Sequence, residues 1–463
     1  MRKLYIARAT GIRGTVGGAV GTNLTPIDTV KFAAAYGNWI KEQRTKKSYR
    51  VVIGRDARIS GAMIQNLVMN TLVGMGIDVI DLDLSTTPTV EIAVPLEYAD
   101  GGIIITASHN PKQWNALKLL DHKGEFLNSI HCQRVLDIAK SDAVEFASVD
   151  ELGIITKNRA YFDIHIDTVL DLEYVNTKAI SDCKFKVVVD AVNSTGGIAI
   201  PLLLERLGVE PVKLHCEPNG HFSHNPEPLK KHLTDLSEKV VASGADFGIA
   251  VDPDVDRLVF FDENGKILGE EYTQVFCSDF VLSINNGDTV STLSSSNALK
   301  DLTKSYGSKY YFTPVGEMNV VKKMKEVNSV VGGEGGGGII YPELHYGRDA
   351  LVGVALFLGL LVKKECKISD LKNDYPEYFM KKLKVLLKDD KIIDKIFQDI
   401  TVKYSDLSPN TDDGVRIDFE DGWVHMRKSN TEPIVRIFSE SSNQSKADNL
   451  ALKIQKEILS LSN

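Results

Sequence analysis

Three aspartates at alternate positions are the residues most suited to chemistry in this chain. Asp252, Asp254 and Asp256 follow an apolar run in the segment AVDPDVDRL. Three carboxylates this close together repel one another strongly unless a cation lies among them, and oxygen-rich sites suit Mg²⁺ or Ca²⁺. A solvated acidic turn is the alternative, but it fits poorly behind a strand that reads as buried. We therefore expect a divalent metal site here.

Two other sites built on closely spaced aspartates fail on the same segment. An EF-hand loop starting at Asp252 would have Arg257 at its sixth position instead of glycine, and Leu258 to Phe261 reads as a strand. A phosphatase of the haloacid-dehalogenase type needs Thr or Val at the position that Asp256 occupies. Neither class of site is expected.

A serine and a histidine stand side by side in the segment ITASHNP, residues 105–111. The apolar run from Gly101 to Ile105 predicts a strand that ends in a tight polar loop. No G-x-S-x-G elbow surrounds Ser108, and neighbours such as Ser108 and His109 seldom pair as nucleophile and base. By itself, the segment indicates a turn more than a nucleophile.

A glycine-rich stretch, GGEGGGG, occupies residues 332–338. It is no P-loop, because no Gly-Lys-Ser/Thr closes it. It lies between Val330-Val331 and an expected strand from Ile339 to Tyr341. Glu334 could contact a ligand that approaches the bare backbone closely. A flexible linker is the alternative.

A last polar segment, RKSNTEPIVR, spans residues 427–436. Guanidinium groups, hydroxyls and exposed amides around one turn suit a phosphate dianion. An ordinary hairpin turn is equally compatible with this stretch alone. The candidate phosphate ligands are Arg427, Ser429, Asn430, Thr431 and Arg436.

The elements that must position these loops follow α/β patterns. A strand at 51–54, helical spacing over 61–75 and a strand at 77–82 predict a parallel β–α–β unit. Related patterns recur at 185–197 and 247–258. We therefore expect three α/β units with loops at the carboxyl ends of strands, where such sheets bind ligands.

The C-terminal region differs from the rest. Alternating polarity over 414–419 and 423–427 predicts a hairpin, followed by a strand at 434–439 and an amphipathic helix at 447–461. A small α+β domain with a mostly antiparallel sheet fits this order. The apolar run 350–362 is too short to span a bilayer and predicts a buried helix. We expect domains at residues 1–155, 156–255, 256–373 and 374–463.

Composition narrows the function classes. The net charge of −8 provides no global basic field for nucleic acid or acidic lipid. The five cysteines are far apart and form no CxxC, which favours free thiols in a reducing compartment. No signal peptide is visible at the N-terminus. We expect a cytoplasmic protein with neither nucleic acid nor membrane as partner.

Taken in order, these four candidate stretches resemble the α-D-phosphohexomutase superfamily, and the likeness covers the whole chain. The resemblance implies an α/β protein: three related α/β domains with mixed sheets, then a smaller α+β C-terminal domain, around a central cleft. It also implies a monomer or homodimer that acts on a small sugar phosphate. Supporting segments are GIRG (11–14), GRDARISG (54–61), TTPT (86–89), VDAVNSTGG (189–197) and HNPEP (224–228).

The resemblance implies a role for each candidate residue. Ser108 matches the phosphoserine that donates and reclaims phosphate, and with the three aspartates it would hold Mg²⁺. Glu334 matches a sugar-hydroxyl contact, and the 427–431 segment matches the phosphate-binding loop. Because three aspartates and a phosphoserine carry far more negative charge than one Mg²⁺ neutralises, cations must line the site. Groups matched to charge balance or proton transfer are Arg13, His109, Lys118 and Arg257.

The implied activity moves phosphate between C1 and C6 of a hexose through a 1,6-bisphosphate, which also serves as activator. The GIRG segment is typical of phosphoglucosamine mutases, which favours glucosamine 6-phosphate and 1-phosphate. A phosphomannomutase/phosphoglucomutase is the alternative within the class. A non-catalytic sugar-phosphate binder and a simple phosphatase are the alternatives outside it.

One departure from the family pattern concerns the sugar loop. Many bacterial members read Gly-Glu-x-Ser-Gly-His there, whereas this chain has Gly336 and Gly338 at the serine and histidine positions. A sugar contact and an acid/base candidate are therefore missing. We expect His109 or Lys118 to take over proton transfer, with His345 as a further candidate.

Overall fold

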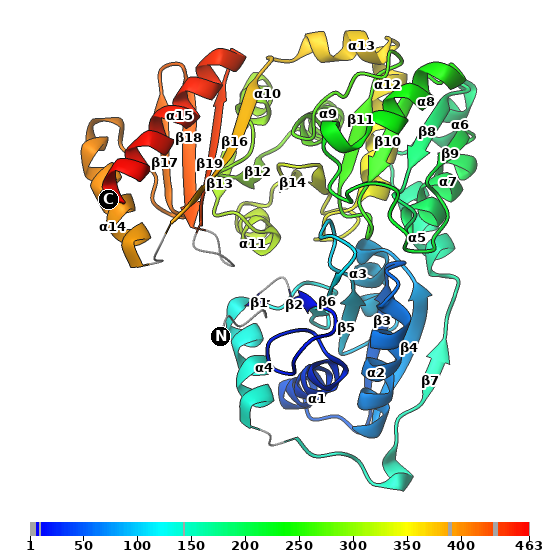
Figure 1. Cartoon of the computed structure of the whole chain (residues 1–463). Coiled ribbons are helices and arrows are strands. Elements are labelled where there is room, and N and C mark those ends of the chain that lie inside the picture. Colours follow the sequence, from blue (N-terminus) through cyan, green and yellow to red (C-terminus); the bar gives the residue numbers. More distant parts are fainter. Residues whose placement is uncertain (1–5, 9–10, 142–143, 388–390, 429–433, 463) are drawn as a thin grey trace. The chain divides into compact units, whose positions relative to one another are not determined.

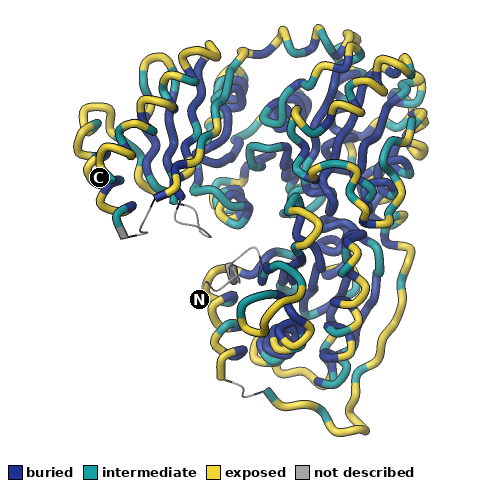
Figure 2. The backbone as a smooth tube through the Cα atoms, in the orientation of Figure 1, coloured by how far each residue is buried: buried dark blue, intermediate teal, exposed yellow. Residues whose placement is uncertain are grey.

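The computed structural model describes the chain except residues 1–5, 9–10, 142–143, 388–390, 429–433 and 463 (Figure 1). The chain forms two compact units. The first comprises Met1–Thr273 and Gly336–Ile368, and the second comprises Gln274–Gly335 and Ser369–Asn463. In both units the strands are mostly buried, whereas many helices expose one side (Figure 2).

The first unit begins with a seven-stranded mixed sheet in the order β1-β2-β6-β5-β3-β4-β7. β3 pairs in parallel with β4 and β5, whereas β5 and β6 are antiparallel. Its strands are β1 (Ile6–Arg8), β2 (Gly11–Thr15), β3 (Tyr49–Arg55), β4 (Ile77–Leu84), β5 (Gly101–Ile105), β6 (Trp114–Leu120) and β7 (Ile155–Lys157). The predicted strand–helix–strand over 51–82 is confirmed as β3, α2 (Gly61–Gly74) and β4.

Helices flank this sheet, and two of them begin at side-chain caps. At α1 (Pro26–Gln43), Thr25 and Asp28 form a capping box, which satisfies two backbone N–H groups at the helix start. At α3 (Thr87–Leu96), the Thr86 side chain accepts from the Thr89 N–H. A third helix is α4 (Ser129–Ser141). The caps matter for function because α3 begins at the TTPT segment, beside the candidate metal loop.

A four-stranded sheet in the order β11-β10-β8-β9 follows in the first unit. β8 is parallel to β9 and β10, and β10 is antiparallel to β11. The three candidate metal ligands lie in the turn between β10 and β11. The strands are β8 (Lys186–Asp190), β9 (Glu210–Leu214), β10 (Phe247–Val251) and β11 (Leu258–Phe261), and the helices are α5 (Tyr161–Leu170), α6 (Thr177–Asp182), α7 (Gly196–Arg206) and α8 (Thr234–Ser243).

The first unit ends with β15 (Gly338–Ile340) and α12 (Ala350–Lys364). The predicted buried helix over 350–362 is confirmed as α12, whose N-cap is Asp349. Within the described part of the chain, no helix combines the length and apolar character needed to cross a membrane. All five cysteines are free thiols, as predicted.

The second unit contains three parallel strands, with β12 between β13 and β14. The predicted loop over 332–338 is wrong in part, because Gly332 to Glu334 belong to β14 and Gly338 begins β15. Glycine stands inside β14 because a Cβ at Gly332 would lie 2.5 Å from the Met324 sulfur. The elements are α9 (Tyr272–Leu282), β12 (Thr289–Thr292), α10 (Asn297–Ser305), β13 (Tyr310–Thr313), α11 (Glu317–Val327), β14 (Val331–Glu334) and α13 (Ile368–Leu371).

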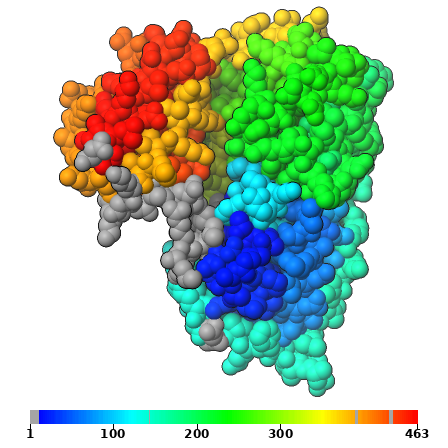
Figure 3. Space-filling view, viewed as in Figure 1, coloured from blue at the N-terminus to red at the C-terminus, as the bar shows by residue number. Residues whose placement is uncertain are grey.

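A four-stranded antiparallel sheet, β16-β19-β18-β17, completes the second unit. The predicted hairpin, strand and final helix are confirmed as β17 to α15, whereas β16 and α14 were not predicted. The final helix lies on the molecular surface, in red in Figure 3. The elements are β16 (Phe379–Leu386), α14 (Lys391–Lys403), β17 (Val415–Phe419), β18 (Gly422–Lys428), β19 (Ile434–Ser441) and α15 (Gln444–Leu461).

The four sheets confirm the predicted fold class of three α/β domains and a smaller α+β domain. The predicted domain boundaries stay predictions. β7 lies at the boundary predicted at residue 155 and pairs with β4 in the first sheet. β11 begins just after the boundary predicted at residue 255 and pairs with β10, which lies before that boundary.

Candidate active site

The three aspartates form a compact buried cluster in the turn between β10 and β11. Asp252, Asp254 and Asp256 are each at most 1% exposed. One ligand atom from each lies within 4.8 Å of the others, and within the described residues this is the single such group of acidic, histidine or cysteine side chains. The strand pair explains the geometry, because β10 and β11 hold both ends of a six-residue turn through paired backbone.

In two of these carboxylates, one oxygen accepts hydrogen bonds from protein donors. Asp254 Oδ2 accepts from Lys118 Nζ at 2.6 Å and from Thr87 Oγ1 at 2.5 Å. Asp256 Oδ2 accepts from Arg348 Nη2 at 2.7 Å and from Lys118 Nζ at 3.3 Å. The Oδ1 atoms of Asp254 and Asp256 are buried without a hydrogen-bond partner. Buried carboxylate oxygens without partners are costly, so this all-oxygen set fits a hard divalent cation such as Mg²⁺.

The pKa values of Asp252 and Asp256 show the same electrostatic conflict. Burial, together with the charges of Asp256 and Asp254, raises the pKa of Asp252 well above its ordinary value. Burial also raises the pKa of Asp256, but Arg348 and Lys118 outweigh it and hold that pKa below its ordinary range. A bound divalent cation would stabilise the ionised form of all three carboxylates.

Ser108 lies directly against this cluster. Its hydroxyl donates to Asp252 Oδ2 at 2.7 Å, and the residue is 4% exposed. Its backbone φ is +50°, in the left-handed region that non-glycine residues seldom adopt. Val255, in the aspartate turn, has a φ of +63°. Backbone strain of this kind concentrates at functional sites, and here it occurs in both loops that meet.

His109 is paired with Ser108 despite being its neighbour in the chain. Its Nδ1 lies 3.2 Å from Ser108 Oγ, a geometry that accompanies the left-handed backbone at Ser108. Burial, followed by the charges of Arg257 and Arg13, lowers the pKa of His109 well below its ordinary value. The ring is therefore neutral at pH 7 and able to accept a proton.

Lys118 stays charged. Burial lowers its pKa, but the charges of Asp254 and Asp256 outweigh that effect and raise the pKa above its ordinary value. Its ammonium group also donates to Thr87 at 3.2 Å. Lys118 therefore balances negative charge and is unsuited to act as a general base at neutral pH.

The other expected cations also gather in this unit, and the structure adds one. Arg257 Nε lies 4.0 Å from Asp256 Oδ1, and Arg13 donates from Nη1 to Asn110 Oδ1 at 2.6 Å, beside Ser108 in the same loop. Arg348 was not predicted from the sequence. Its one signal is its position immediately before Asp349, which caps a helix that the sequence does predict.

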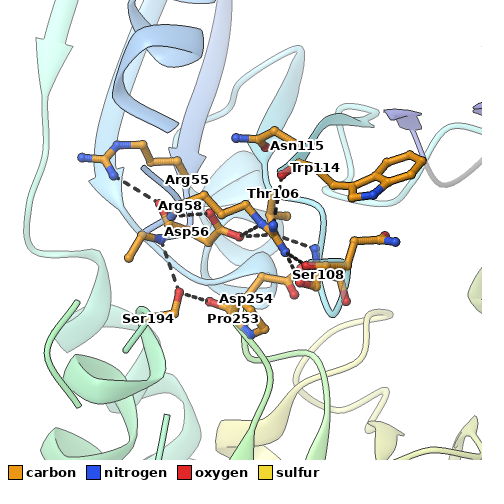
Figure 4. Close-up of polar contacts among 12 residues, drawn as sticks. Arg55, Asp56, Arg58, Thr106, Ser108, Trp114, Asn115, Ser194, Pro253 and Asp254 are labelled. Atoms are coloured by element: carbon orange, nitrogen blue, oxygen red, sulfur yellow. Dashed lines mark hydrogen bonds and ion pairs between the residues drawn. The ribbon is translucent and has the colours of Figure 1, made fainter. Parts of the chain in front are cut away.

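A buried arginine holds the loop that carries Ser108 (Figure 4). Arg58 is 1% exposed, and its Nε donates to Asp56 Oδ2 at 3.0 Å. Thr106 Oγ1 donates to the same carboxylate oxygen at 2.6 Å. The two terminal nitrogens of Arg58 donate over 2.5–3.0 Å to four backbone carbonyls, those of Ser108, Asn110, Pro111 and Trp114.

Two further segments tie this loop region to the aspartate turn. Ser194, from the VDAVNSTGG segment, donates to the Pro253 carbonyl at 2.7 Å and accepts from the Ala57 N–H at 3.3 Å. Thr87, from TTPT, donates its N–H to the Asp254 carbonyl at 2.9 Å. Three of the supporting segments, GRDARISG, TTPT and VDAVNSTGG, thus contact the two loops that meet at Ser108.

His345 belongs to a different cluster. Its ring nitrogens lie 3.4 Å from Glu91 Oε2 and 3.4 Å from Asp349 Oδ2. His165 Nε2 lies 2.9 Å from the same oxygen of Asp349 and its Nδ1 lies 2.9 Å from Thr89 Oγ1. Within the described contacts, His345 therefore meets carboxylates on α3 and at the start of α12 instead of Ser108.

The second unit carries the remaining sequence candidates. Glu334, at the end of β14, accepts the Gly316 N–H at 2.8 Å. Arg427 Nε lies 3.0 Å from Asp413 Oδ2, and Arg427 stands opposite Arg436 across β18 and β19. Two cationic side chains opposite each other on one sheet face repel, so the pair favours a bound anion. Ser429, Asn430 and Thr431 lie outside the described residues.

His425 lies on the same face of β18 as Arg427, two residues away. The His425 Nδ1 is 2.8 Å from Ser294 Oγ, and its Nε2 is 2.6 Å from the Asp413 carbonyl oxygen. Because a carbonyl only accepts, Nε2 carries the proton and Nδ1 accepts from the serine hydroxyl. Burial lowers the pKa of His425 to about 4.

We expect His425 to make the protein less stable as the pH falls from about 6.5, the usual pKa of an unfolded histidine, to about 4. In that window the unfolded chain binds a proton that the folded chain excludes, so the free energy of unfolding falls by about 2–3 kcal/mol. His425→Gln should remove most of this contribution. Urea unfolding at pH 7 and pH 4.5 measures it.

His221→Gln is the matched control, because His221 is exposed and its imidazole is not part of a buried pair. That variant should keep the wild-type dependence of unfolding free energy on pH. An unchanged dependence in His425→Gln would show that the buried imidazole does not resist protonation.

The fold and site together define an α/β protein in which a buried acidic cluster faces a serine hydroxyl. Four family models match consecutive parts of the chain. They are described as phosphoglucomutase/phosphomannomutase alpha/beta/alpha domain I (residues 5–145), domain II (163–265) and domain III (269–379), and the C-terminal domain (380–457).

Full-length relatives agree with these models. A phosphoglucomutase/phosphomannomutase of Thermococcus kodakarensis is 36% identical over 96% of this chain and 98% of its own. A probable phosphoglucosamine mutase of Methanopyrus kandleri is 30% identical over 95% of each chain. A crystal structure of a Burkholderia thailandensis family member superposes with a TM-score of 0.83 at 26% identity, over 100% of this chain and 97% of that one.

The chain therefore belongs to the phosphoglucomutase/phosphomannomutase family, whose members are phosphohexomutases, a class of isomerase. This confirms the family that the sequence resemblance indicated.

Proposed function

We propose that this chain is a Mg²⁺-dependent phosphohexomutase that moves a phosphoryl group between C1 and C6 of a hexose phosphate through phospho-Ser108. One observation carries the proposal. The Ser108 hydroxyl donates to Asp252 at 2.7 Å, within a buried trio in which Asp254 and Asp256 each retain one carboxylate oxygen without a hydrogen-bond partner. A non-catalytic binder needs no serine at an acidic cation site.

In the first half-reaction, the bond between phosphorus and Ser108 Oγ breaks as the free hydroxyl oxygen of a hexose monophosphate bonds to phosphorus. The proton of that hydroxyl must pass to Ser108 Oγ. His109 is the relay we assign, because its ring is neutral and its Nδ1 lies 3.2 Å from Oγ. The resulting 1,6-bisphosphate turns end for end, and the same steps in reverse return the other phosphate to Ser108.

Fixed positive charge surrounds the transfer. Lys118, from β6, pairs with Asp254 and Asp256, and Arg257 stands at the end of the aspartate turn. Arg13, from β2, donates to Asn110 in the Ser108 loop. These groups offset the charge that spreads over the transferring phosphoryl oxygens. Asp252, Asp254, Asp256 and the phosphoserine would hold Mg²⁺, which when bound polarises the phosphoryl group.

For the rest of the substrate we assign the second-unit residues by the same resemblance. Glu334 would bind sugar hydroxyls, and Arg427 with Arg436 would bind the phosphate that is not reacting. The opposed positions of the two arginines in β18 and β19 support this role. Ser429, Asn430 and Thr431 complete the proposed phosphate loop.

We propose glucosamine 6-phosphate and 1-phosphate as the preferred pair, because of the GIRG segment and the Methanopyrus relative's name. The Thermococcus relative, which is 36% identical, favours a phosphomannomutase/phosphoglucomutase instead. We therefore propose one preparation assayed against the 1-phosphates of glucosamine, glucose and mannose, primed with a hexose 1,6-bisphosphate as activator.

The expected result is isomerisation of all three sugars with glucosamine 1-phosphate fastest and little release of inorganic phosphate. Glucosamine phosphate turning over far more slowly than the others would refute the proposed preference. Inorganic phosphate appearing in step with substrate loss would indicate a phosphatase. Binding without turnover would indicate a binder and refute the mutase itself.

A further inference from the structure

Arg348 reaches the candidate metal cluster from outside the segments that define it. It lies between β15 and α12, and its Nη2 donates to Asp256 Oδ2 at 2.7 Å. Its side chain is 13% exposed, so it is largely enclosed. The same carboxylate oxygen accepts from Lys118 at 3.3 Å, while Asp256 Oδ1 has no hydrogen-bond partner. Two cations therefore hold one oxygen of Asp256 and leave the other available.

The space that Arg348 uses exists because residue 338 is a glycine. A Cβ at Gly338 would lie 2.4 Å from Arg348 Cδ and 3.1 Å from its Cγ, and the third nearest atom is Arg348 Nε at 3.6 Å. All three nearest atoms thus belong to one side chain. The backbone does not require glycine there, because Gly338 is a strand residue and is not among those with positive φ.

These two observations explain the unusual glycine at position 338. In many bacterial family members the corresponding position carries histidine. In this chain the absence of a side chain at Gly338 leaves room for the aliphatic part of Arg348. The guanidinium group of Arg348 binds Asp256, a candidate metal ligand. Arginine suits this use because its planar fork can fix the orientation of a carboxylate.

We propose that Arg348 is a positioning residue that orients Asp256 for metal binding and that enters the cluster through the space left by Gly338. The inference rests on the proposed function for its metal. Arg348 acts through Asp256 and need not touch the sugar phosphate. Partners that orient a metal ligand typically change metal affinity by about 10–100-fold when they are removed.

The test is a double-mutant cycle on metal affinity, measured with Mn²⁺ by calorimetry on unphosphorylated full-length protein without sugar. Arg348→Ala is expected to weaken Mn²⁺ binding at least about 10-fold. Arg348→Lys, which keeps the charge and one donor nitrogen but loses the planar fork, should recover part of that loss. Gly338→Ala should weaken binding to a similar extent, because its Cβ displaces the arginine stem.

The decisive variant combines both changes. Once Arg348 is alanine, Gly338→Ala meets no arginine stem, so the double variant should bind Mn²⁺ as Arg348→Ala does. Independent, additive losses would overturn the proposed pairing. Mn²⁺ affinity in Arg348→Ala equal to or tighter than wild type would overturn the orienting role, because it would show that the arginine only adds competing positive charge.

Two controls separate this role from general damage. Arg206→Ala removes an arginine whose partners, Asp163 and Asp167, lie on α5, and Gly74→Ala adds a methyl group whose nearest neighbour is 3.5 Å away. Both should keep wild-type Mn²⁺ affinity, and thermal melting checks that every variant folds. The readout needs no turnover, so the two proposals can fail separately. A wild type that binds Mn²⁺ but shows no mutase activity would refute the proposed activity and leave this inference standing. Normal Mn²⁺ binding in an otherwise active Arg348→Ala would refute this inference alone.

Discussion

Replacing Ser108 by alanine is expected to lower turnover of every hexose 1-phosphate substrate by at least about 10³-fold, because loss of a covalent nucleophile typically costs this much or more. The reason lies in the local contacts. Ser108 is the hydroxyl held against Asp252, and His109 lies within reach to move its proton. Intact mass after incubation with hexose 1,6-bisphosphate should show one added phosphoryl group in the wild type and none in the variant.

Ser243→Ala is the matched control, since its hydroxyl donates only to the Val240 carbonyl at the end of α8. This variant should gain the phosphoryl group and keep wild-type turnover. If Ser108→Ala still gained one phosphoryl group and isomerised its substrate at a similar rate, another residue would carry the phosphate, and the proposed mechanism would be wrong.

Arg58 is expected to give the second large effect, although it touches none of the reacting atoms. Its removal would leave Asp56 without its ionic partner, in a position where burial already raises the pKa of that carboxyl group. It would also release four loop carbonyls at once. Breaking a buried ion pair costs about 3–5 kcal/mol, so Arg58→Ala should be strongly destabilised.

Arg58→Lys separates the loop effect from the stability effect. Lysine keeps the positive charge near Asp56, but it lacks the planar fork that binds several carbonyls. We expect a folded protein whose rate of phosphoryl gain at Ser108 falls about 100-fold, since a displacement of about 1 Å at a reacting atom has that effect. The KM for sugar phosphate should change much less than kcat.

Urea unfolding and the time course of intact mass measure these two effects of Arg58 separately. Arg206→Ala is again a suitable control, because its partners lie on the surface helix α5. A folded Arg58→Lys variant that gained phosphate at the wild-type rate would show that the four carbonyl contacts do not position Ser108.

Much of the fold could be predicted because local patterns determine it. The branched apolar runs of β3 and β4, the continuous apolar stretch of α12 and the alternation in β17 and β18 each indicate their element without distant contacts. The glycine stretch was harder. Gly332 reads as loop by composition, yet it is a strand residue because Met324 packs where a side chain would lie.

The candidate site was predictable where motifs carry it and not where long-range contacts do. Ser108 and the three aspartates stand in recognisable segments, and the fold brings them together. Arg348 and Arg58 could not be assigned roles from the sequence, because Asp256 lies 92 positions from Arg348 and the four carbonyls that Arg58 binds lie 50 or more positions away from it. The contact between Ser108 and His109 depends on a left-handed backbone at Ser108, which the residue types do not predict.

The most direct measurement of the central claim is a crystal structure of the phosphorylated protein grown with Mn²⁺, with anomalous scattering recorded at the manganese edge. We expect one strong anomalous peak among Asp252, Asp254 and Asp256, at coordination distance from an oxygen of phospho-Ser108. A phosphorylated Ser108 with no anomalous peak among these three carboxylates, or with manganese bound elsewhere in the chain, would contradict it.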